Sequence, residues 1–313
     1  MGRASVERAA EKLLAKIADL LAAACHDRER LGTAPALRID VLAATDDWAV
    51  EDVLCTHRPN DAMFEERHER YRIALVGAGT FQCRAPGGRE LLTPGALLLG
   101  NALECFECGH EHGGGDRCLA FAFSQETFEQ LAFDTGVRGR PRFRALRVPP
   151  LHALAPVVAE AGTIWQRQRE RADATEWEEL GVRLAAGAVR LATDPSRAPR
   201  TPRNAERGVA RTIRLIEKDS SARLGLQALA REAKLSRFHY LRAFTRVTGL
   251  TPHRYVTRSR LRRAAIRLAA TDARVIDVAL DCGYRDVANF NHAFRAEFGT
   301  TPLEHRARFR RRH

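Results

Sequence analysis

The sequence predicts an α+β protein that combines an N-terminal β-barrel, flanked by helices, with a C-terminal part that is entirely helical. Three observations lead to this fold class. Between residues 38 and 123, short apolar runs such as YRIALVGAG and RCLAFAF alternate with turns rich in Gly and Pro, a pattern typical of short strands in a barrel or sandwich. The segments on either side carry apolar residues at helical spacing. The excess of positive charge is confined to the last third of the chain.

Helical periodicity and composition divide the chain further. Apolar residues recur every three or four positions over residues 5–30, which predicts an amphipathic helix. Two more helices are predicted within residues 150–193, where they are expected to form an antiparallel pair or a dimer interface. The stretch TDPSRAPRTPRN holds three prolines and almost no apolar side chains, which is typical of a linker. We therefore expect an N-terminal domain over residues 1–193, a linker over 194–204 and a C-terminal domain over 205–313.

The chain offers no segment suited to a membrane. No apolar run approaches the ~20 residues that a transmembrane helix needs, and charges interrupt the apolar residues near the N-terminus. We expect a cytoplasmic protein without a membrane partner. In a reducing compartment the seven cysteines, an odd number, are expected to be thiols or metal ligands rather than disulfides.

The charge is distributed unevenly along the chain. Residues 205–313 hold 24 Lys and Arg against 10 Asp and Glu, whereas residues 1–204 hold 27 against 29. Such a concentration of basic side chains favours an anionic partner for the C-terminal domain, because Lys and Arg that neutralise phosphates release condensed counterions. The alternative is a solvated basic surface in a protein rich in Arg, which supplies 47 of the 51 basic residues.

An internal repeat lies in this basic part of the chain. FTRVTGLTPHRY begins at Phe244 and FRAEFGTTPLEHR begins at Phe294, so the two copies are 50 residues apart. Upstream of each copy the pattern predicts a helix, a short turn and a second helix. Ser236 and Asp286 fall at the N-cap positions of the two second helices. Gly283 can supply the positive φ that the turn between such helices often requires.

The repeat therefore predicts two helix-turn-helix units. The long amphipathic stretch TPHRYVTRSRLRRAAIRLAATD joins them and can act as a rigid spacer. Two such units on one linking helix could present both recognition helices to successive major grooves, ~34 Å apart. An ordinary helical bundle is the alternative, but a bundle does not account for the basic excess in the same segment. We therefore expect double-stranded DNA as the partner.

The segments LQALAREAKLSRFHYLRAFTRVTGLTPHRYV, RLRRAAIRLA and VIDVALDCGYRDVANFNHAFRAEFGTTPLEHR together resemble the DNA-binding domain of the AraC/XylS family. The resemblance covers most of residues 205–313. It implies a transcription regulator on promoter DNA, located with the nucleoid in the cytoplasm, with RNA polymerase as a further partner if the protein is an activator. Two positions depart from the family pattern: Tyr284 stands where Phe is usual, and His292 stands where relatives often carry Arg.

Helical spacing separates core from surface on the first recognition helix. Tyr240 and Phe244 are expected to face inward, which leaves Phe238 and Arg242 outside as neighbours four residues apart. We expect Arg242 to read guanine through O6 and N7, and Phe238 to touch a thymine methyl group. The full set of candidate DNA contacts is Arg237, Phe238, Arg242, Arg246, Arg258, Asn289, His292 and Arg295.

The remaining candidates have expected roles of other kinds. Arg246 and Arg258 are expected to contact phosphates. On the second recognition helix, Asn289 and His292 are expected to point outward, and Asn289 can pair with adenine N6 and N7. For each candidate the alternative is a solvated polar side chain without a role in recognition.

The N-terminal domain contains a cluster of possible ligands. Cys105, Cys108, His110 and His112, followed by Cys118, have the residue types of a tetrahedral zinc site, and the run Gly113–Gly115 would let the loop fold back. Cys55, His57 and His68 could contribute if strands bring them near. The alternatives are a thiol redox sensor and loop residues without special chemistry.

Regulators with such a C-terminal domain often carry an N-terminal sensing and dimerising domain of cupin-like type. The resemblance thus implies a cupin-like barrel, a homodimer, and a small-molecule or metal effector. A metal-dependent cupin enzyme would need ligands such as His57, Glu66 and His68 around an open metal position. No nucleophile elbow, P-loop or dinucleotide fingerprint occurs in the chain. We therefore expect no enzyme, but a sequence-specific regulator controlled by a signal at the N-terminal domain.

Overall fold

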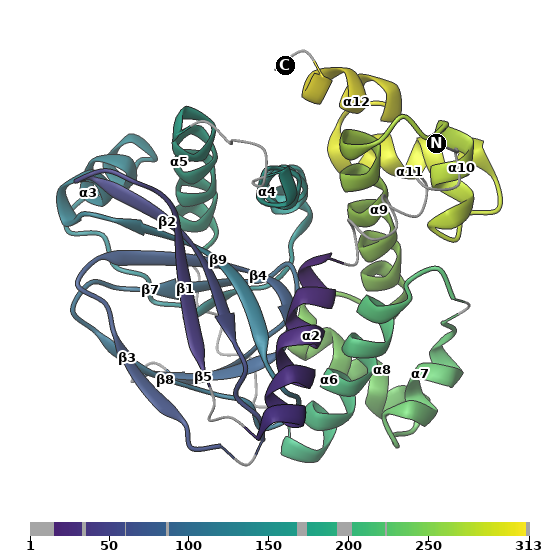
Figure 1. Cartoon of the computed structure of the whole chain (residues 1–313), viewed down its shortest axis with the longest axis horizontal. Coiled ribbons are helices and arrows are strands. Elements are labelled where there is room, and N and C mark those ends of the chain that lie inside the picture. Colours follow the sequence, from purple (N-terminus) through teal and green to yellow (C-terminus); the bar gives the residue numbers. More distant parts are fainter. Residues whose placement is uncertain are drawn as a thin grey trace.

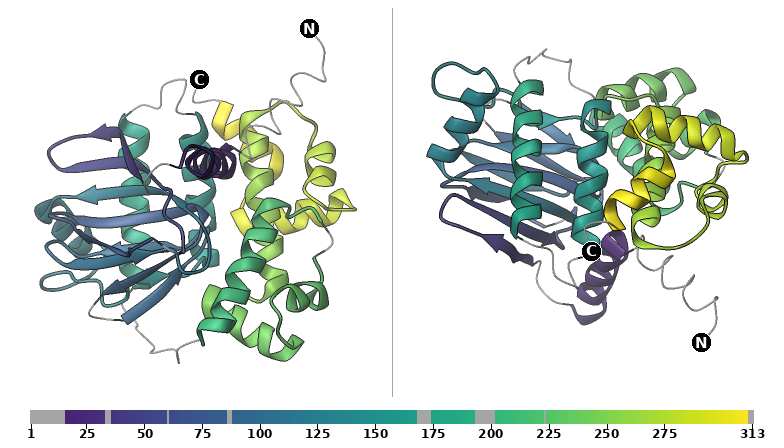
Figure 2. Two further views of the ribbon diagram at one scale, coloured as in Figure 1. Left: turned by 60° about the horizontal axis from the view of Figure 1, so that its bottom comes forward. Right: turned by 90° about the horizontal axis from the view of Figure 1, so that it is seen from above.

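The computed structural model describes residues 16–32, 36–59, 61–85, 88–167, 174–192, 202–222 and 224–310. It contains an N-terminal part built on β-sheets and a C-terminal part built of helices, which lie against each other (Figures 1 and 2). The predicted class, a mixed fold with a strand-rich first part and a helical last part, is confirmed. No helix in the described ranges is long and apolar enough to cross a membrane.

The strands form two antiparallel sheets. The larger has the order β1 (Leu37–Ala44), β2 (Trp48–Cys55), β9 (Asp116–Phe123), β4 (Tyr71–Gly79), β7 (Leu97–Gly100) and β10 (Arg147–Val148). The smaller has the order β3 (Phe64–Arg67), β8 (Cys105–Gly109), β5 (Phe81–Ala85) and β6 (Gly88–Leu92). Within the described residues no hydrogen-bonded ladder joins the two sheets, so they do not close the barrel that the strand pattern predicts.

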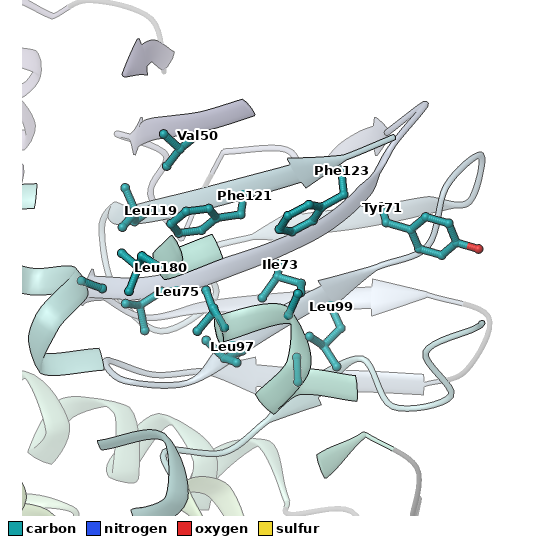
Figure 3. Close-up of a cluster of buried hydrophobic side chains, with 14 of the residues drawn as sticks. Val50, Tyr71, Ile73, Leu75, Leu97, Leu99, Leu119, Phe121, Phe123 and Leu180 are labelled. Atoms are coloured by element: carbon teal, nitrogen blue, oxygen red, sulfur yellow. The ribbon is translucent and has the colours of Figure 1, made fainter. Parts of the chain in front are cut away.

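Alternation along the strands of the larger sheet gives it two apolar faces. One face carries Ala74 and Val76, which pack with Phe81 and Phe106 of the smaller sheet. The opposite face carries the strand residues labelled in Figure 3, which pack together with Leu180 of the helical layer. A sheet buried on both faces explains why β9 is buried along its whole length.

Helices flank the sheets. They are α2 (Lys16–Leu31), α3 (Gln125–Asp134), the short 3₁₀ helix η1 (His152–Leu154), α4 (Ala155–Arg167) and α5 (Ala174–Leu191). Trp177 and Leu184 of α5 are fully buried against the larger sheet. The first part of the helix predicted over residues 5–30 lies outside the described residues, as does most of the linker predicted over 194–204. The sequence pattern did not reveal α3.

The C-terminal part consists of α6 (Arg203–Lys218), α7 (Leu226–Glu232), α8 (Arg237–Thr248), α9 (Pro252–Ala270), α10 (Val275–Asp281), α11 (Val287–Phe298) and α12 (Pro302–Arg310). The pairs α7–α8 and α10–α11 are the two helix-turn-helix units, and α9 links them (Figure 1). Each unit has its own apolar core, centred on Tyr240 and Phe244 in the first and on Phe290 and Phe294 in the second.

Local chemistry fixes the ends of both second helices. Ser236 caps α8 by accepting a hydrogen bond from the backbone N–H of His239, and Asp286 caps α11 in the same way. Both helices end at a glycine in the left-handed conformation, Gly249 with φ 74° and Gly299 with φ 72°. The repeat therefore has a structural counterpart at both ends of each second helix.

The N-terminal part touches both helix-turn-helix units. Ala159 of α4 belongs to the core of the second unit, and Leu91 of β6 belongs to the core of the first. The hydroxyl of Tyr255 on α9 donates to the carbonyl oxygen of Pro94 at 3.3 Å. The two parts of the protein are therefore in direct contact at both units and at the helix that links them.

Candidate DNA-binding surface and a buried cysteine–histidine cluster

The exposed face of α8 carries three of the predicted DNA contacts. Tyr240 and Phe244 are fully buried, whereas Arg237, Phe238 and Arg242 are exposed, with Phe238 accessible over 64% of its surface. The guanidinium carbon of Arg242 lies 5.5 Å from the centre of the Phe238 ring. This cation–π contact orients the Arg242 side chain at the surface. The exposed ring of Phe238 and the oriented guanidinium of Arg242 are together suited to contact with base edges.

The exposed face of α11 carries the second set. Asn289, His292 and Arg295 are exposed, whereas Phe290 and Phe294 are fully buried. Asp286 accepts hydrogen bonds from the backbone N–H groups of both Ala288 and Asn289, at 3.0 and 3.1 Å. This cap fixes the first turn of α11, which is the turn that presents Asn289.

An open hollow of about 610 Å³ lies between α9 and the second helix-turn-helix unit. Its walls include His253, Thr257 and Arg260 of α9, and Asn289 of α11. Arg260 is held in place by the carbonyl oxygens of Ser220 and Ala222, at 2.6 and 3.0 Å. The lining of the hollow combines the donors Arg260, Arg285 and Asn289 with the acidic Asp286 and with apolar side chains.

The two remaining Arg candidates differ in their surroundings. Arg246 lies in the last turn of α8 and is partly exposed. Arg258 lies between the two parts of the protein, where it donates to the carbonyl oxygen of Pro150 at 2.6 Å and pairs with Glu297 at 2.9 Å. Burial lowers the pKa of Arg258, although the Glu297 carboxylate partly opposes this. The guanidinium predicted to contact phosphate is thus bound within the protein.

The turn of the first unit differs from that of the second. Gly283 takes the positive φ expected of it, 84°. In the first unit the left-handed residue is Lys234, with φ 57°, although Lys has a Cβ that disfavours this conformation. Its backbone N–H donates to the carbonyl oxygen of Arg231, as Gly283 does to Leu280. The two turns therefore share a hydrogen-bonding pattern without sharing a glycine.

The five predicted metal ligands do not converge. Cys105 and Cys108 lie three residues apart on β8, and a strand sends such positions to opposite faces, so Cys105 is exposed and Cys108 is buried. Cys108 lies directly across from Cys83 in the neighbouring strand. His112 points away from both and lies 3.4 Å from the Glu206 carboxylate.

A different group of side chains comes together instead. Cys55, His110 and Asp116 are buried, and each offers a ligand atom within 4.8 Å of the other two. Pairing of β2 with β9 places Cys55 opposite Asp116. His110 Nε2 lies 2.7 Å from Asp116 Oδ1, and the thiol of Cys118 donates to Asp116 Oδ2 at 3.2 Å. His57 Nδ1 lies 3.3 Å from the sulfur of Cys55.

Sequence reasoning named Cys55 as a contributor that depended on strand pairing, but it missed Asp116. The available signal was an acidic residue directly after the GHEHGGG loop, at the start of a run that becomes apolar after Arg117. A buried carboxylate requires a partner, so such a position is a candidate ligand or ion-pair site. The three residues come from two strands and a loop, and only the fold brings them together.

The thiols of this region are strongly protonated. Burial raises the pKa of Cys55 and of Cys118, and the Asp116 carboxylate raises both further. The pKa of Cys108 is also raised, mainly by its hydrogen bond with Cys83. Burial lowers the pKa of His57, with a smaller contribution from His110. A redox-sensing thiol needs a depressed pKa and access to solvent, so these surroundings do not favour a redox sensor.

Of the three residues that a metal-dependent cupin enzyme would need, only two lie close to each other. His68 Nε2 lies 3.1 Å from the Glu66 carboxylate. His57 is turned elsewhere, with its ring 4.6 Å from that of Phe64. Within the described residues, these three side chains do not form a group with metal-ligand spacing.

Comparison with known proteins agrees with the helical part of the structure. A family model described as a helix-turn-helix domain matches residues 229–308. Regulatory protein SoxS of Salmonella typhimurium is 32% identical over 96 residues, which are 31% of this chain and 90% of that protein. The transcriptional activator RhaS of Mannheimia succiniciproducens is 32% identical over 101 residues, which are 32% of this chain and 38% of that protein.

Two solved structures match the same third of the chain. An AraC-type regulator from Chromobacterium violaceum is 26% identical, with a TM-score of 0.33, over 34% of this chain and 96% of that one. The DNA-binding domain of AdpA in complex with a target DNA is 28% identical, with a TM-score of 0.33, over 34% and 95%. Since SoxS is matched along nine-tenths of its length, the chain belongs to the AraC/XylS family of DNA-binding transcription regulators.

Proposed function

We propose that this protein is a sequence-specific transcription regulator that reads promoter DNA with α8 and α11 under the control of a signal received by its N-terminal part. The observation that carries the proposal is the pair of capped helices, at equivalent positions of the repeat, whose outer faces are polar and exposed. The basic excess of residues 205–313 supports an anionic partner for the part of the chain that contains both helices. We assign the protein no catalytic role.

The two helices have different chemistry and should read different bases. Arg242 is suited to guanine O6 and N7, and Phe238 both orients it and can touch a thymine methyl group. Asn289 is suited to adenine N6 and N7. The other exposed side chains, Arg237, Arg246, His292 and Arg295, are proposed to contact phosphates or neighbouring bases. Arg258 is left out of the proposed contacts because its donors are occupied by Pro150 and Glu297.

The proposal also assigns a separate role to each segment of the chain. Residues 1–193 would sense the signal and dimerise through a cupin-like domain, residues 194–204 would link, and residues 205–313 would read DNA. Two sheets packed around a shared core are compatible with a cupin-like domain. The similarity to RhaS, a transcriptional activator, supports activation and hence contact with RNA polymerase in the cytoplasm. The effector would be a small molecule or a metal ion.

The test is a DNA-binding comparison of the full chain with two matched variants. Arg242→Ala should lose discrimination worth ~1–3 kcal/mol at one or two base pairs, while weak and salt-sensitive binding persists. Arg38→Ala removes an exposed guanidinium from β1 and should leave both affinity and base preference unchanged. An unaltered base preference for Arg242→Ala would show that α8 is not the reading helix.

A further inference from the structure

We propose that Cys55, His110 and Asp116 bind a divalent transition-metal ion of the Zn²⁺ type, with His57 as the fourth ligand, and that the ion controls DNA binding through the loop 110–115. The inference deepens the proposed function and rests on it for the second half, since it names the class of signal that the N-terminal part receives. It also replaces the five ligands expected from the sequence with a set that only the fold brings together.

The spacing of the three buried side chains is close to that of a tetrahedral site, and His57 adjoins one of them. In such a site with bonds of ~2.0–2.3 Å, neighbouring ligand atoms are ~3.3–3.8 Å apart. The atoms of the three buried residues lie within 4.8 Å of one another, and His57 Nδ1 lies 3.3 Å from the Cys55 sulfur. His110 and Asp116 are closer, at 2.7 Å, because they are joined by a hydrogen bond that the ion would replace. Closing these gaps completes the three-ligand set, whereas His57, which lies outside the group of mutually close ligand atoms, must turn toward the ion to supply the fourth ligand.

The surroundings leave the ligands available and match the charge of the ion. The side chain of His110 is only 1% exposed, and its Nδ1 has no hydrogen-bond partner among the described residues. A thiolate from Cys55 and the carboxylate of Asp116 together neutralise a dication, which avoids an uncompensated buried charge. On binding, the thiol of Cys55 gives its proton to solvent. His57 is only half-buried and offers the ion a path from solvent.

The ligands lie at both ends of the loop 110–115, which also touches the DNA-binding part. His110 begins the loop, and Asp116 follows its last residue. Between them His112 Nε2 lies 3.4 Å from Glu206, and the guanidinium of Arg214 donates to the carbonyl oxygen of His112 at 2.5 Å. A Cβ at Gly113 would lie 2.5 Å from Arg214 Nη1, so the loop backbone packs directly on that side chain.

Glu206 is the central charge of this contact. It is buried and also pairs with Arg89 of β6 at 2.9 Å, while Arg89 pairs with Glu111 of the loop at 3.0 Å. Removal or displacement of one member would leave another buried charge without its partner, which is costly. The contact is therefore sensitive to the position of the loop.

Helix α6, which the loop 110–115 contacts, packs on α8. Glu206 and Arg214 belong to α6, whose Ile213 shares a core with Phe244 of α8. The hydroxyl of Tyr240 on α8 donates to the hydroxyl oxygen of Thr212 on α6 at 3.0 Å. A continuous set of packed and hydrogen-bonded residues thus leads from the proposed ion to the helix that carries Arg242.

The first experiment measures metal binding by the full chain after chelator treatment, with Co²⁺ as the spectroscopic probe and Zn²⁺ as competitor. We expect one equivalent of Co²⁺ with thiolate charge-transfer absorption and tetrahedral ligand-field bands, both displaced by Zn²⁺. Cys55→Ser should abolish the charge-transfer band, and His110→Gln should weaken binding more than ~100-fold. Cys105→Ser removes an exposed thiol of the preceding strand β8 and should bind as the original chain does.

Several results would overturn the site. They are the lack of a stoichiometric ion in the unaltered chain, an octahedral spectrum without thiolate absorption, and loss of the band in Cys105→Ser but not in Cys55→Ser. The spectrum of the unaltered chain needs no substitution, so the proposal stays falsifiable if Cys55→Ser does not fold. Circular dichroism identifies that case.

The second experiment compares affinity for a specific DNA fragment with and without Zn²⁺. Coupling free energies between sites are typically worth about 5- to 150-fold, and we expect a change of at least fivefold. Glu206→Gln should keep the cobalt spectrum but reduce this change. Unaltered DNA affinity on addition of Zn²⁺ would refute the coupling between the ion and DNA binding, but not the proposal that the protein is a transcription regulator. Failure to bind any specific DNA, with or without the ion, would instead refute the proposed function, while the cobalt titration would still decide the metal site.

Discussion

Arg242 and Phe238 are one helical turn apart on α8, and the contact between them illustrates how a single side chain prepares another. Long guanidinium side chains lose rotamer freedom when they bind, and an aromatic neighbour reduces that loss. Phe238 has no apolar cover and would be costly as a purely structural residue. Its exposed position is explained if the ring orients Arg242 and contacts a base.

His305 of α12 gives a prediction about pH at the same scale. Its ring is buried against Phe294 and Phe309, and the carbonyl oxygen of Ala265 lies 3.2 Å from Nε2. Burial lowers the pKa of His305 to about 4. The unfolded chain takes up this proton near pH 6.5, whereas the folded chain does so only near pH 4. The stability contributed by the neutral ring is therefore complete above pH 6.5 and is lost as the pH falls toward 4, up to about 3 kcal/mol.

Urea unfolding of the full chain between pH 4 and pH 7.5 checks this expectation. His305→Phe should flatten the loss of stability below pH 6.5. His253→Gln, which changes an exposed histidine of α9, should retain it. Equal pH dependence in the His305→Phe variant and the unaltered chain would mean that another group causes the effect.

At the scale of elements, the second helices show how much of the fold the sequence determines. Caps, buried aromatic pairs and C-terminal glycines repeat every 50 residues, so α8 and α11 follow from local pattern and propensity. The left-handed Lys234 does not, because no local signal marks a lysine for that conformation. It follows from packing of the first unit, and only the structure reveals it.

The glycines that end these helices allow a matched comparison. An alanine at Gly249 or Gly299 would have to adopt a positive φ, at a cost of ~1–2 kcal/mol. A Cβ at Gly249 would also lie 2.9 Å from Pro149 Cβ of the N-terminal part, whereas a Cβ at Gly299 would meet nothing within 4 Å. Gly249→Ala should therefore lower the free energy of unfolding more than Gly299→Ala does. Equal losses in urea titrations would argue against the close approach of Pro149.

The strands and the ligand cluster mark the limit of sequence reasoning. Short alternating runs predict strands, but not which strands pair, because pairing depends on contacts far apart in the sequence. The two separate sheets and the juxtaposition of Cys55 with Asp116 depend on that pairing. In the sequence Cys105 and His112 are as good candidate metal ligands as His110. Strand alternation exposes Cys105, however, and His112 lies against Glu206.

At the scale of the whole molecule, the N-terminal part lies against both helix-turn-helix units, and one of the contacts uses a residue that the sequence alone would assign to DNA. Arg258 is the clearest case, since a basic residue on a helix of a basic domain is a natural phosphate contact. The fold gives it Pro150 and Glu297 instead, and so makes it part of the contact between the two parts. Regulation of the two reading helices by the N-terminal part is consistent with this arrangement.

The most direct test of the account is selection of binding sites from randomised DNA by the full chain, by Arg242→Ala and by Asn289→Ala. The unaltered chain should select an asymmetric site with two groups of specified base pairs, about 10 base pairs apart. Arg242→Ala should relax one group and Asn289→Ala the other. If both variants relaxed the same base pairs, or if neither changed the selected sequence, the reading of DNA by α8 and α11 would be contradicted.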